Sequence, residues 1–433
     1  MLYFDLRDPA QESALRAAFA ARVSSAHDAE GEATVRAILD AVRTEGDPAV
    51  IRYTRRFDCA EAVALRVPAS AITDAANRVR EMPLWDALQV AAGRIRSFHE
   101  RGKRESWLTL DTPGETLGQM VRPLSRVGVY VPGGTAAYPS TVLMATIPAQ
   151  VAGVPSIALA TPPGKNGLPP DATLAAAQIA GVSEVYAMGG AQAVAALAFG
   201  TESVASVVKI VGPGNRFVNL AKRLLFGTVG IDMLAGPSEV GVLCDDTANV
   251  VSIATEIIAQ TEHDPLNSAL VVSTSQAIAD ALPAEIERQL SDLPRAEVVR
   301  AALTKFGYLV FAPDLPDAIA VINDYAPEHL HVYLHDPWRA VPMIENAGAI
   351  LIGEASTAAL GDYVAGPCHT LPTAGNARFS SPLHVDDFQK KTSIIALGSA
   401  VAAELAPAAL SIATFEGLEA HARSARHVLM NAK

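Results

Sequence analysis

Cysteine is scarce in this sequence. The 433 residues include three cysteines, Cys59, Cys244 and Cys368, which are widely spaced and form no CxxC pair. A disulfide framework needs an even set of cysteines, and a thiolate zinc site needs cysteines that are closely spaced. The cysteine pattern therefore disfavours both, and any metal bound by this chain must use nitrogen and oxygen ligands.

Basic residues and long apolar runs are also in short supply. The chain has 34 Lys and Arg against 46 Asp and Glu, a formal charge of -12, which disfavours nucleic acids and anionic membrane surfaces as partners. No uninterrupted apolar run reaches the length of a membrane span. Asp5, Arg7 and Asp8 interrupt the start of the chain before a signal peptide can form. We therefore expect a cytoplasmic protein without membrane or nucleic-acid partners.

The remaining composition is that of a globular protein, since 50% of the residues are apolar and 18% are charged. At about 150 residues per domain the length predicts two or three domains. Residues 1 to about 105 have helical patterns, at 30–43, from Asp47 and Pro48 onward, and over 70–101. We interpret these helices as packing elements without chemistry.

From Arg126 onward, short apolar runs that end in glycine alternate with helical patterns, as in a parallel sheet with crossover helices. Ligands of such sheets bind beyond the carboxyl ends of the strands. Three strand ends are candidate nucleotide contacts: Tyr130 with Gly133 and Gly134, residues 189–192, and residues 212–215. No GxGxxG or Walker motif is present, so plain strand-to-helix turns are an equally good interpretation and the pattern does not name the nucleotide.

A second alternating unit begins at residue 239, with a helix predicted over 248–263 and strands at 268–273, 307–312, 329–334 and 348–353. In that helix Gln260 and His263 are three residues apart, a spacing that places both on one face, within reach of one metal ion. A helix-end cap or a solvated face would give the same spacing. Eight of the ten histidines lie at or after position 263, which points to the C-terminal half for metal or acid-base chemistry.

Three downstream segments, 326–331, 361–373 and 416–421, offer carboxylate and imidazole groups together. Glu328 and His329 precede a strand and should point in different directions, so that one could act as a base for substrate and the other for water. A surface turn is the alternative. Asp362 and His369 lie in an irregular loop bounded by glycines and prolines, which suits ligand placement, although single polar loop residues are usually just solvated.

Taken together, these segments resemble the histidinol dehydrogenase family. The motifs that carry the resemblance are RVGVYVPGG, GGAQAVAALAFGTESV, GPGN, AGPSE, QTEH, APEHL, GDY, HTLPT, ARFSSP and EAH. The resemblance implies oxidation of L-histidinol through L-histidinal to L-histidine, the last step of histidine biosynthesis, with two NAD and one zinc per active site. It also implies a homodimer in which the C-terminal tail completes the active site of the partner.

The resemblance also assigns roles to particular residues. It implies zinc ligands at Gln260, His263, Asp362 and His421, an acid-base pair at Glu328 and His329, further substrate contacts at Ser238, His369 and Glu416, and NAD contacts at Tyr130, Gln192 and Asn215. Because histidinol carries an imidazole and an amine, the zinc ligands count as substrate-binding residues as well. Cys368 stands where many family members have Asn, and Ala358 where many have Glu.

The expected fold class is α/β, with two Rossmann-like doubly wound lobes and helical extensions at both ends. We expect an N-terminal helical extension over 1–28, a zinc- and substrate-binding lobe formed by 29–125 with 239–385, an NAD-binding lobe over 126–238, and a helical dimerisation tail over 386–433. A related zinc- and NAD-dependent dehydrogenase of another small alcohol, such as a sulfonated propanediol, is the nearest alternative, and His369 with Glu416 favours histidinol over it. A zinc hydrolase would not need the glycine-turn lobe, and a non-catalytic binding protein would not need so many titratable groups.

Overall fold

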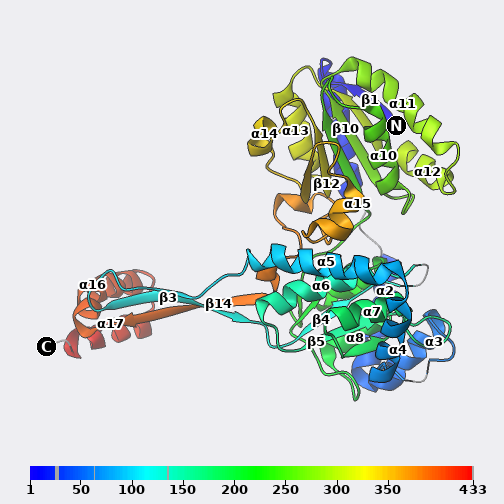
Figure 1. Ribbon diagram of the computed structural model, residues 1–433. Coiled ribbons are helices and arrows are strands. Elements are labelled where there is room, and N and C mark those ends of the chain that lie inside the picture. Colours follow the sequence, from blue (N-terminus) through cyan, green and yellow to red (C-terminus); the bar gives the residue numbers. More distant parts are fainter. Residues whose placement is uncertain (25–28, 63, 134–135, 432–433) are drawn as a thin grey trace.

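The structure is a computed structural model that describes residues 1–24, 29–62, 64–133 and 136–431. The chain forms two α/β lobes and a long arm that projects from them and carries the C-terminus (Figure 1). The α/β fold class predicted from the alternating patterns is confirmed. Within the described residues, none of the helices is long and apolar enough to cross a membrane.

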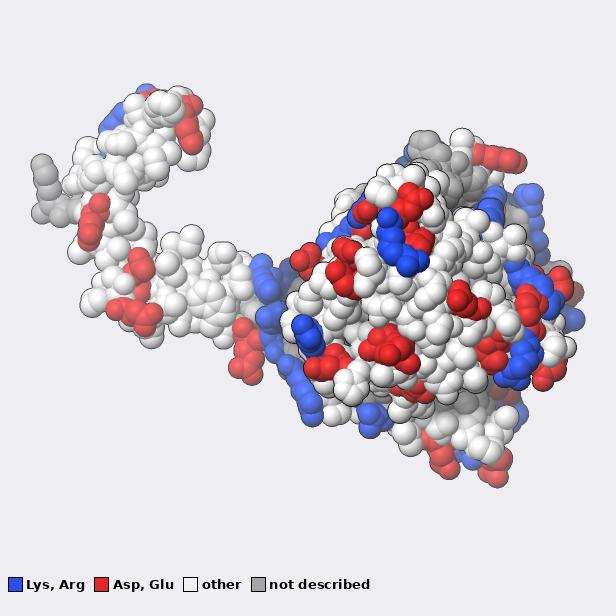
Figure 2. Space-filling model, turned by 90° about the horizontal axis from the view of Figure 1, so that it is seen from above, with Lys and Arg blue, Asp and Glu red and all other residues white. Residues whose placement is uncertain are grey.

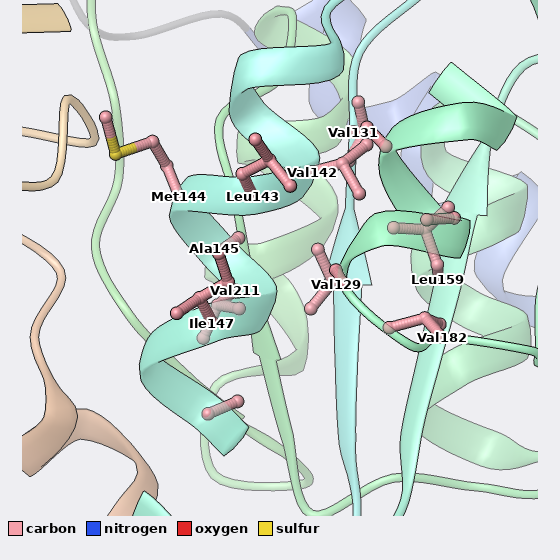
Figure 3. Close-up of a cluster of buried hydrophobic side chains, with 14 of the residues drawn as sticks. Val129, Val131, Val142, Leu143, Met144, Ala145, Ile147, Leu159, Val182 and Val211 are labelled. Carbon is pink, nitrogen blue, oxygen red and sulfur yellow. The ribbon is translucent and has the colours of Figure 1, made fainter. Parts of the chain in front are cut away.

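The first lobe is built on a parallel five-stranded sheet of order β6-β5-β4-β7-β8. Its strands are β4 (Val127–Tyr130), β5 (Ile157–Thr161), β6 (Val185–Ala187), β7 (Lys209–Val211) and β8 (Gly230–Ile231), and its crossover helices are α6 (Pro139–Ala152), α7 (Asp171–Ile179), α8 (Gly190–Phe199) and α9 (Arg216–Leu225). Val127 and Val129 of β4 join a core that includes α6, drawn in Figure 3, whereas Tyr130 joins the core of the opposite face. Because both faces are buried, the strands read as short continuous apolar runs.

The helices that precede this sheet in sequence also belong to the first lobe. They are α2 (Ala29–Glu45), α3 (Asp47–Phe57), α4 (Ala69–Arg80) and α5 (Pro83–Glu100). Val35 and Ile38 of α2 share a core with α8, and Ile72 of α4 shares a core with α6. The expectation that residues 29–125 join the second lobe is therefore wrong, because the apolar faces of these helices are buried against the first. The single helix expected over 70–101 is divided at Pro83 into α4 and α5.

The second lobe contains a parallel six-stranded sheet of order β1-β11-β10-β9-β12-β13. Its strands are β1 (Leu2–Asp5), β9 (Glu239–Cys244), β10 (Ser268–Ser273), β11 (Gly307–Phe311), β12 (His329–Tyr333) and β13 (Ala349–Ile352). Its helices are α1 (Pro9–Ser24), α10 (Val250–Thr261), α11 (Gln276–Leu290), α12 (Ala296–Phe306), α13 (Leu315–Tyr325) and α14 (Pro337–Ala340), and short turns follow at η1 (Val341–Met343), α15 (Ala358–Leu360), η2 (Gly361–Ala365), η3 (Asn376–Arg378) and η4 (Val385–Phe388).

The N-terminus is the part of this lobe that differs from expectation. Residues 1–28 were expected to be helical, but β1 pairs in parallel with β11 at the edge of the sheet, and α1 packs on the same lobe. A strand of four residues is too short to show a period in the sequence. The start of the chain is thus an edge of the second lobe, and residues 25–28 lie outside the described part.

The arm is an antiparallel sheet of order β14-β3-β2 with two helices at its end. Its elements are β2 (Trp107–Thr109), β3 (Glu115–Pro123), β14 (Gln389–Leu397), α16 (Ser399–Phe415) and α17 (Glu419–Asn431). The expectation of helices alone after residue 386 is wrong, because β14 pairs with β3 along its whole length. No residue of β14 is buried in the single chain, so the strand shows no alternation of apolar and polar side chains.

Candidate functional site

Glu328 and His329 lie where the second sheet meets the loop 361–369. A left-handed Ala326 (φ 53°) ends α13, and the chain turns through Pro327 into β12, so both side chains are buried at one end of the sheet. The carboxylate of Glu328 accepts a hydrogen bond from the main-chain N of Glu239 at 3.0 Å. Although the two residues are adjacent, His329 Nδ1 lies 3.8 Å from Glu328 Oε2, so the pair faces a single site.

His329 is held from the other side by Asp362, whose Oδ1 lies 2.9 Å from His329 Nε2. Burial raises the pKa of Glu328 to about 7. Burial alone would lower the pKa of His329, but the hydrogen bond to Asp362 and the charge of Glu328 outweigh it and raise that pKa to about 8. Both groups therefore titrate near neutral pH, the range in which a side chain transfers protons most effectively.

The loop that carries Asp362 also connects the two lobes. His369 Nδ1 donates to the main-chain oxygen of Asp362 at 2.9 Å, and the hydroxyl of Thr141, in the first turn of α6, lies 3.2 Å from His369 Nε2. Because a carbonyl oxygen only accepts, the proton of a neutral His369 is on Nδ1 and Nε2 accepts from Thr141. Burial lowers the pKa of His369, which favours this neutral form.

The expected metal ligands are only partly gathered by one chain. Gln260 is buried in the last turn of α10, and its side chain hydrogen-bonds Asp362. The helix ends at Thr261, however, so His263 is exposed in a bend beyond it and is not part of the helix predicted over 248–263. Within the described residues, no three His, Cys, Asp or Glu side chains form a group that could hold a metal ion.

Two of the expected site residues are on the arm. Glu416 follows α16 and His421 lies in α17, where both are exposed and line a hollow of about 450 Å³ between the two helices. Figure 1 shows these helices at the far end of the arm, away from both lobes. Ser238, in contrast, precedes β9 and is fixed by its main chain, which donates to Asn267 Oδ1 at 3.0 Å. Within a single chain, Ser238 therefore lies in the second lobe, whereas Glu416 and His421 lie on the arm, away from both lobes.

The first lobe has a cavity of about 630 Å³ at the carboxyl ends of its strands. Tyr130, Gln192 and Asn215, the three residues expected to contact NAD, all line it, as do Gly133, Gly190 and Ala191. Gln192 Oε1 is buried and has no hydrogen-bond partner among the described residues. A ligand bound in the cavity would supply the missing donor. Asn215 caps α9 by accepting from the main-chain N of Phe217 and Val218.

Not every glycine at these strand ends serves a ligand. Gly212 has φ 114°, and a Cβ at this position would lie 2.0 Å from the main-chain oxygen of Tyr130, so this glycine is required by the packing of β7 against β4. Gly134 lies outside the described residues. Gly212 is therefore a plain turn residue between strand and helix, whereas Gly133 and Gly190 line the cavity.

Sequence reasoning missed several residues that shape the two sites. Asp58 lines the cavity of the first lobe and accepts from Gln192 Nε2 at 3.2 Å. Buried Glu256 accepts from the main-chain N of Ala358 at 2.9 Å and so anchors the loop of Asp362 to α10, one turn before Gln260. The spacing of one helical turn between Glu256 and Gln260 could have identified Glu256 from the sequence. Asp58 and Thr141 are far from the other site residues in sequence, and only the fold brings them to the two sites.

The two departures noted in the sequence have structural settings. Ala358 begins the short helix α15, and its main-chain N donates a hydrogen bond to the carboxylate of Glu256. Cys368 is buried in the core beside α6, and its Sγ lies 3.4 Å from the main-chain oxygen of Met144. Burial raises the pKa of this thiol to about 12, so it is an inert packing group.

Comparison with known proteins places these sites in a family. The family model of histidinol dehydrogenase matches residues 21–429. Histidinol dehydrogenases from Halalkalibacterium halodurans and Bacillus subtilis are each 48% identical to this chain, over 390 and 395 residues, which cover 90% and 91% of the chain and 92% of each relative. A crystal structure of histidinol dehydrogenase from Elizabethkingia anophelis matches with a TM-score of 0.91 at 33% identity and covers 100% of this chain and 98% of that one. The chain therefore belongs to the histidinol dehydrogenase family.

Proposed function

We propose that this protein is a zinc-dependent L-histidinol dehydrogenase, which oxidises L-histidinol through L-histidinal to L-histidine with reduction of two NAD. The observation that carries the proposal is the convergence of Glu328, His329, Asp362 and His369 beside Gln260, in a chain of this family. The first oxidation releases a hydride and a proton from an alcohol, and the second does the same from a hydrated aldehyde. The site must therefore supply a base for each step and a water for the second.

His329 is the base for the alcohol. Its Nε2 is held by the carboxylate of Asp362 at 2.9 Å and therefore carries the ring proton of the neutral form, which leaves Nδ1, a buried atom without a hydrogen-bond partner among the described residues, to receive the hydroxyl proton. Glu328 is the base for the water that adds to the aldehyde, because its buried carboxylate is held by the main-chain N of Glu239 and is free to accept a proton when ionised. Its pKa of about 7 keeps the two protonation states close in free energy at neutral pH.

His369 and Ser238 contact the substrate beside this pair. The neutral His369 is oriented by Asp362 and Thr141, so its ring is positioned before substrate arrives. Such preorganisation reduces the entropy lost when the reacting groups are aligned. The bond to Thr141 also ties the substrate site to the first lobe, from which the nicotinamide must approach.

The residues of the site fit a zinc ion only when a second chain contributes. Gln260 and Asp362 already contact one another, and His263 lies three residues beyond Gln260. Zinc accepts nitrogen and oxygen donors of this kind, and a catalytic zinc also keeps room for substrate. His421 of the partner subunit completes the set, and Glu416 of the partner subunit pairs with the substrate ammonium. When bound, zinc would hold the imidazole and amine of histidinol and leave the carbinol free for oxidation.

The arm is suited to reach a partner. Its helices expose large apolar side chains, including Ile412 and Phe415, the latter 94% exposed in the single chain. Figure 2 shows wide uncharged areas on the arm between separate groups of acidic and basic side chains. Monomeric proteins rarely leave such a contiguous apolar surface uncovered. A homodimer with exchanged arms buries this surface and brings Glu416 and His421 to the partner's site. The net charge of -12 accords with a cytoplasmic enzyme that binds neither nucleic acid nor membrane.

The test is NADH formation from L-histidinol before chelation, after chelation and after zinc is restored. The proposal expects two NADH per histidinol, loss of activity with the metal, and recovery with zinc. A sulfonated propanediol serves as the comparison alcohol. Faster turnover of that alcohol, or activity that survives complete removal of metal, would contradict the proposal.

A further inference from the structure

The first lobe lacks the acidic residue that a dinucleotide-binding sheet usually carries. In such folds an Asp or Glu follows the second strand and accepts a hydrogen bond from the 2′-hydroxyl of the adenosine ribose. Here the second strand of the lobe is β5, and the residues that follow Thr161 are Pro162, Pro163 and Gly164. No carboxylate occurs after β5 until Asp171, which begins α7 and forms an ion pair with Arg78.

A carboxylate from another segment occupies this place. Asp58 follows the end of α3, and a Cβ built on Gly189 would lie 2.6 Å from Pro162 Cγ and 3.0 Å from Asp58 Oδ1. The carboxylate of Asp58 thus lies close to the residue that follows β5, although it is more than a hundred residues earlier in the chain. Gly189 is the residue that allows this approach, since any side chain there would separate the two.

The carboxylate of Asp58 is fixed and faces the cavity. Its Oδ2 accepts from Gln192 Nε2 at 3.2 Å, the main-chain N of Gly189 also hydrogen-bonds it, and the residue lines the cavity with Tyr130 and Asn215. Burial raises its pKa to about 6, so it is ionised at the mildly alkaline pH of a dehydrogenase assay. An ionised carboxylate only accepts hydrogen bonds, which suits a hydroxyl donor and repels a phosphate.

The position of Asp58 assigns it to the adenosine half of the cofactor. The catalytic residues meet this lobe at Thr141, through His369. The nicotinamide must therefore extend from the cavity toward Thr141. The cavity is also lined by Thr34 of α2 and by Phe57 and Asp58 at the end of α3, and Figure 1 draws α3 on the side of the first lobe that faces away from the second lobe. The adenosine remains at this side.

We propose that Asp58 accepts a hydrogen bond from the 2′-hydroxyl of the adenosine ribose and thereby makes the enzyme specific for NAD over NADP. This inference rests on the proposed NAD-dependent function. Arg56, which also lines the cavity, does not reverse the preference, because it is exposed and its guanidinium lies 5.2 Å from the centroid of the Phe57 ring, where solvent screens it.

The experiment measures binding of AMP and of adenosine 2′,5′-bisphosphate to the full-length protein by calorimetry, in the absence of histidinol. The variant is Asp58→Asn, which keeps an oxygen for Gln192 and removes the charge. The matched control is Asp40→Asn, which removes one charge from the same lobe at a side chain that is 72% exposed and does not line the cavity. Thermal unfolding of both variants checks that the fold is kept.

We expect the wild type and Asp40→Asn to prefer AMP strongly, and Asp58→Asn to reduce the ratio of the two affinities by about tenfold or more. The ratio of kcat/KM for NAD and NADP should change in the same direction. An unchanged affinity ratio in a folded Asp58→Asn protein, or a wild type that binds both nucleotides alike, would overturn the inference. Absence of histidinol oxidation with a normal Asp58-dependent preference would count against the proposed function alone, since fragment binding does not need the reaction.

Discussion

Replacement of Glu328 by Gln tests the division of labour between the two bases. The amide has the same shape and keeps an oxygen that can accept from the main-chain N of Glu239, so the site should stay assembled. Gln cannot take a proton from water, whereas His329 remains to take one from the alcohol. Loss of a general base costs about 10² to 10⁴ in rate. We therefore expect oxidation of supplied histidinal to fall by that factor, and the first oxidation of histidinol to fall by much less.

The same substitution should change stability with a defined dependence on pH. Burial raises the pKa of the Glu328 carboxyl from 4.5 to about 7, so the folded state binds a proton that the unfolded state releases between these values. The stability that this group contributes is complete below pH 4.5 and is lost as pH rises through about 7. The loss amounts to about 3 kcal/mol. Glu328→Gln avoids it, so its Tm relative to wild type should increase between pH 5 and pH 8.

The assays are stopped-flow NADH formation from histidinol and from histidinal, with thermal unfolding at several pH values. Glu345→Gln is the matched control, because it makes the same chemical change at an exposed position of the same lobe. Equal losses in both oxidations would refute the assignment of Glu328 to water. A Tm difference that does not grow with pH would show that burial does not raise the pKa of the Glu328 carboxyl.

Three further predictions concern the metal and the arm. His263→Asn should lose bound zinc and activity, because removal of the imidazole weakens the ligand set. Full zinc occupancy by mass spectrometry would remove His263 from the ligand set. His329→Asn and His421→Asn proteins should each be inactive, yet when refolded together in equal amounts they should recover about a quarter of wild-type activity, because about half the dimers are mixed and each has one intact site. No recovery from confirmed mixed dimers would mean that His421 serves its own chain. Phe415→Asp should place a charge on the apolar arm and shift the protein toward monomers in sedimentation, and an unchanged dimer would exclude this face from the interface.

The sequence predicted the buried sheets well and the exposed one poorly. β4 and β9 are buried on both faces, so their apolar runs identified them without any homologue, and β4 is also followed in the sequence by two glycines. β14 could not be identified in this way, because none of its side chains is buried in one chain and its partner β3 is more than 260 residues earlier. The pattern of α2 and α4 identified helices but did not say which lobe they cover, since an apolar face does not specify its partner.

The site was predictable only where its residues lie close together in the sequence. Glu328 and His329 come from one short segment, and their proximity to a strand end marked them from the sequence. The pairing of His329 with Asp362, and of His369 with Thr141, joins segments that only the fold brings together. The predicted helix over 248–263 was too long at its C-terminal end, because α10 stops at Thr261 and His263 lies in a bend beyond it.

The bond between Thr141 and His369 explains how the two lobes can act as one enzyme. The nucleotide cavity belongs to the first lobe, and the acid-base pair belongs to the second. Hydride transfer requires the two reacting carbons to meet at about 3 to 3.5 Å, so a small shift between the lobes would cost much of the rate. His369 contacts the loop of Asp362 with one ring nitrogen and α6 with the other. Its ring therefore contributes, with Arg94 and Cys368, to the contacts that join this loop to the first lobe where substrate and nicotinamide must meet.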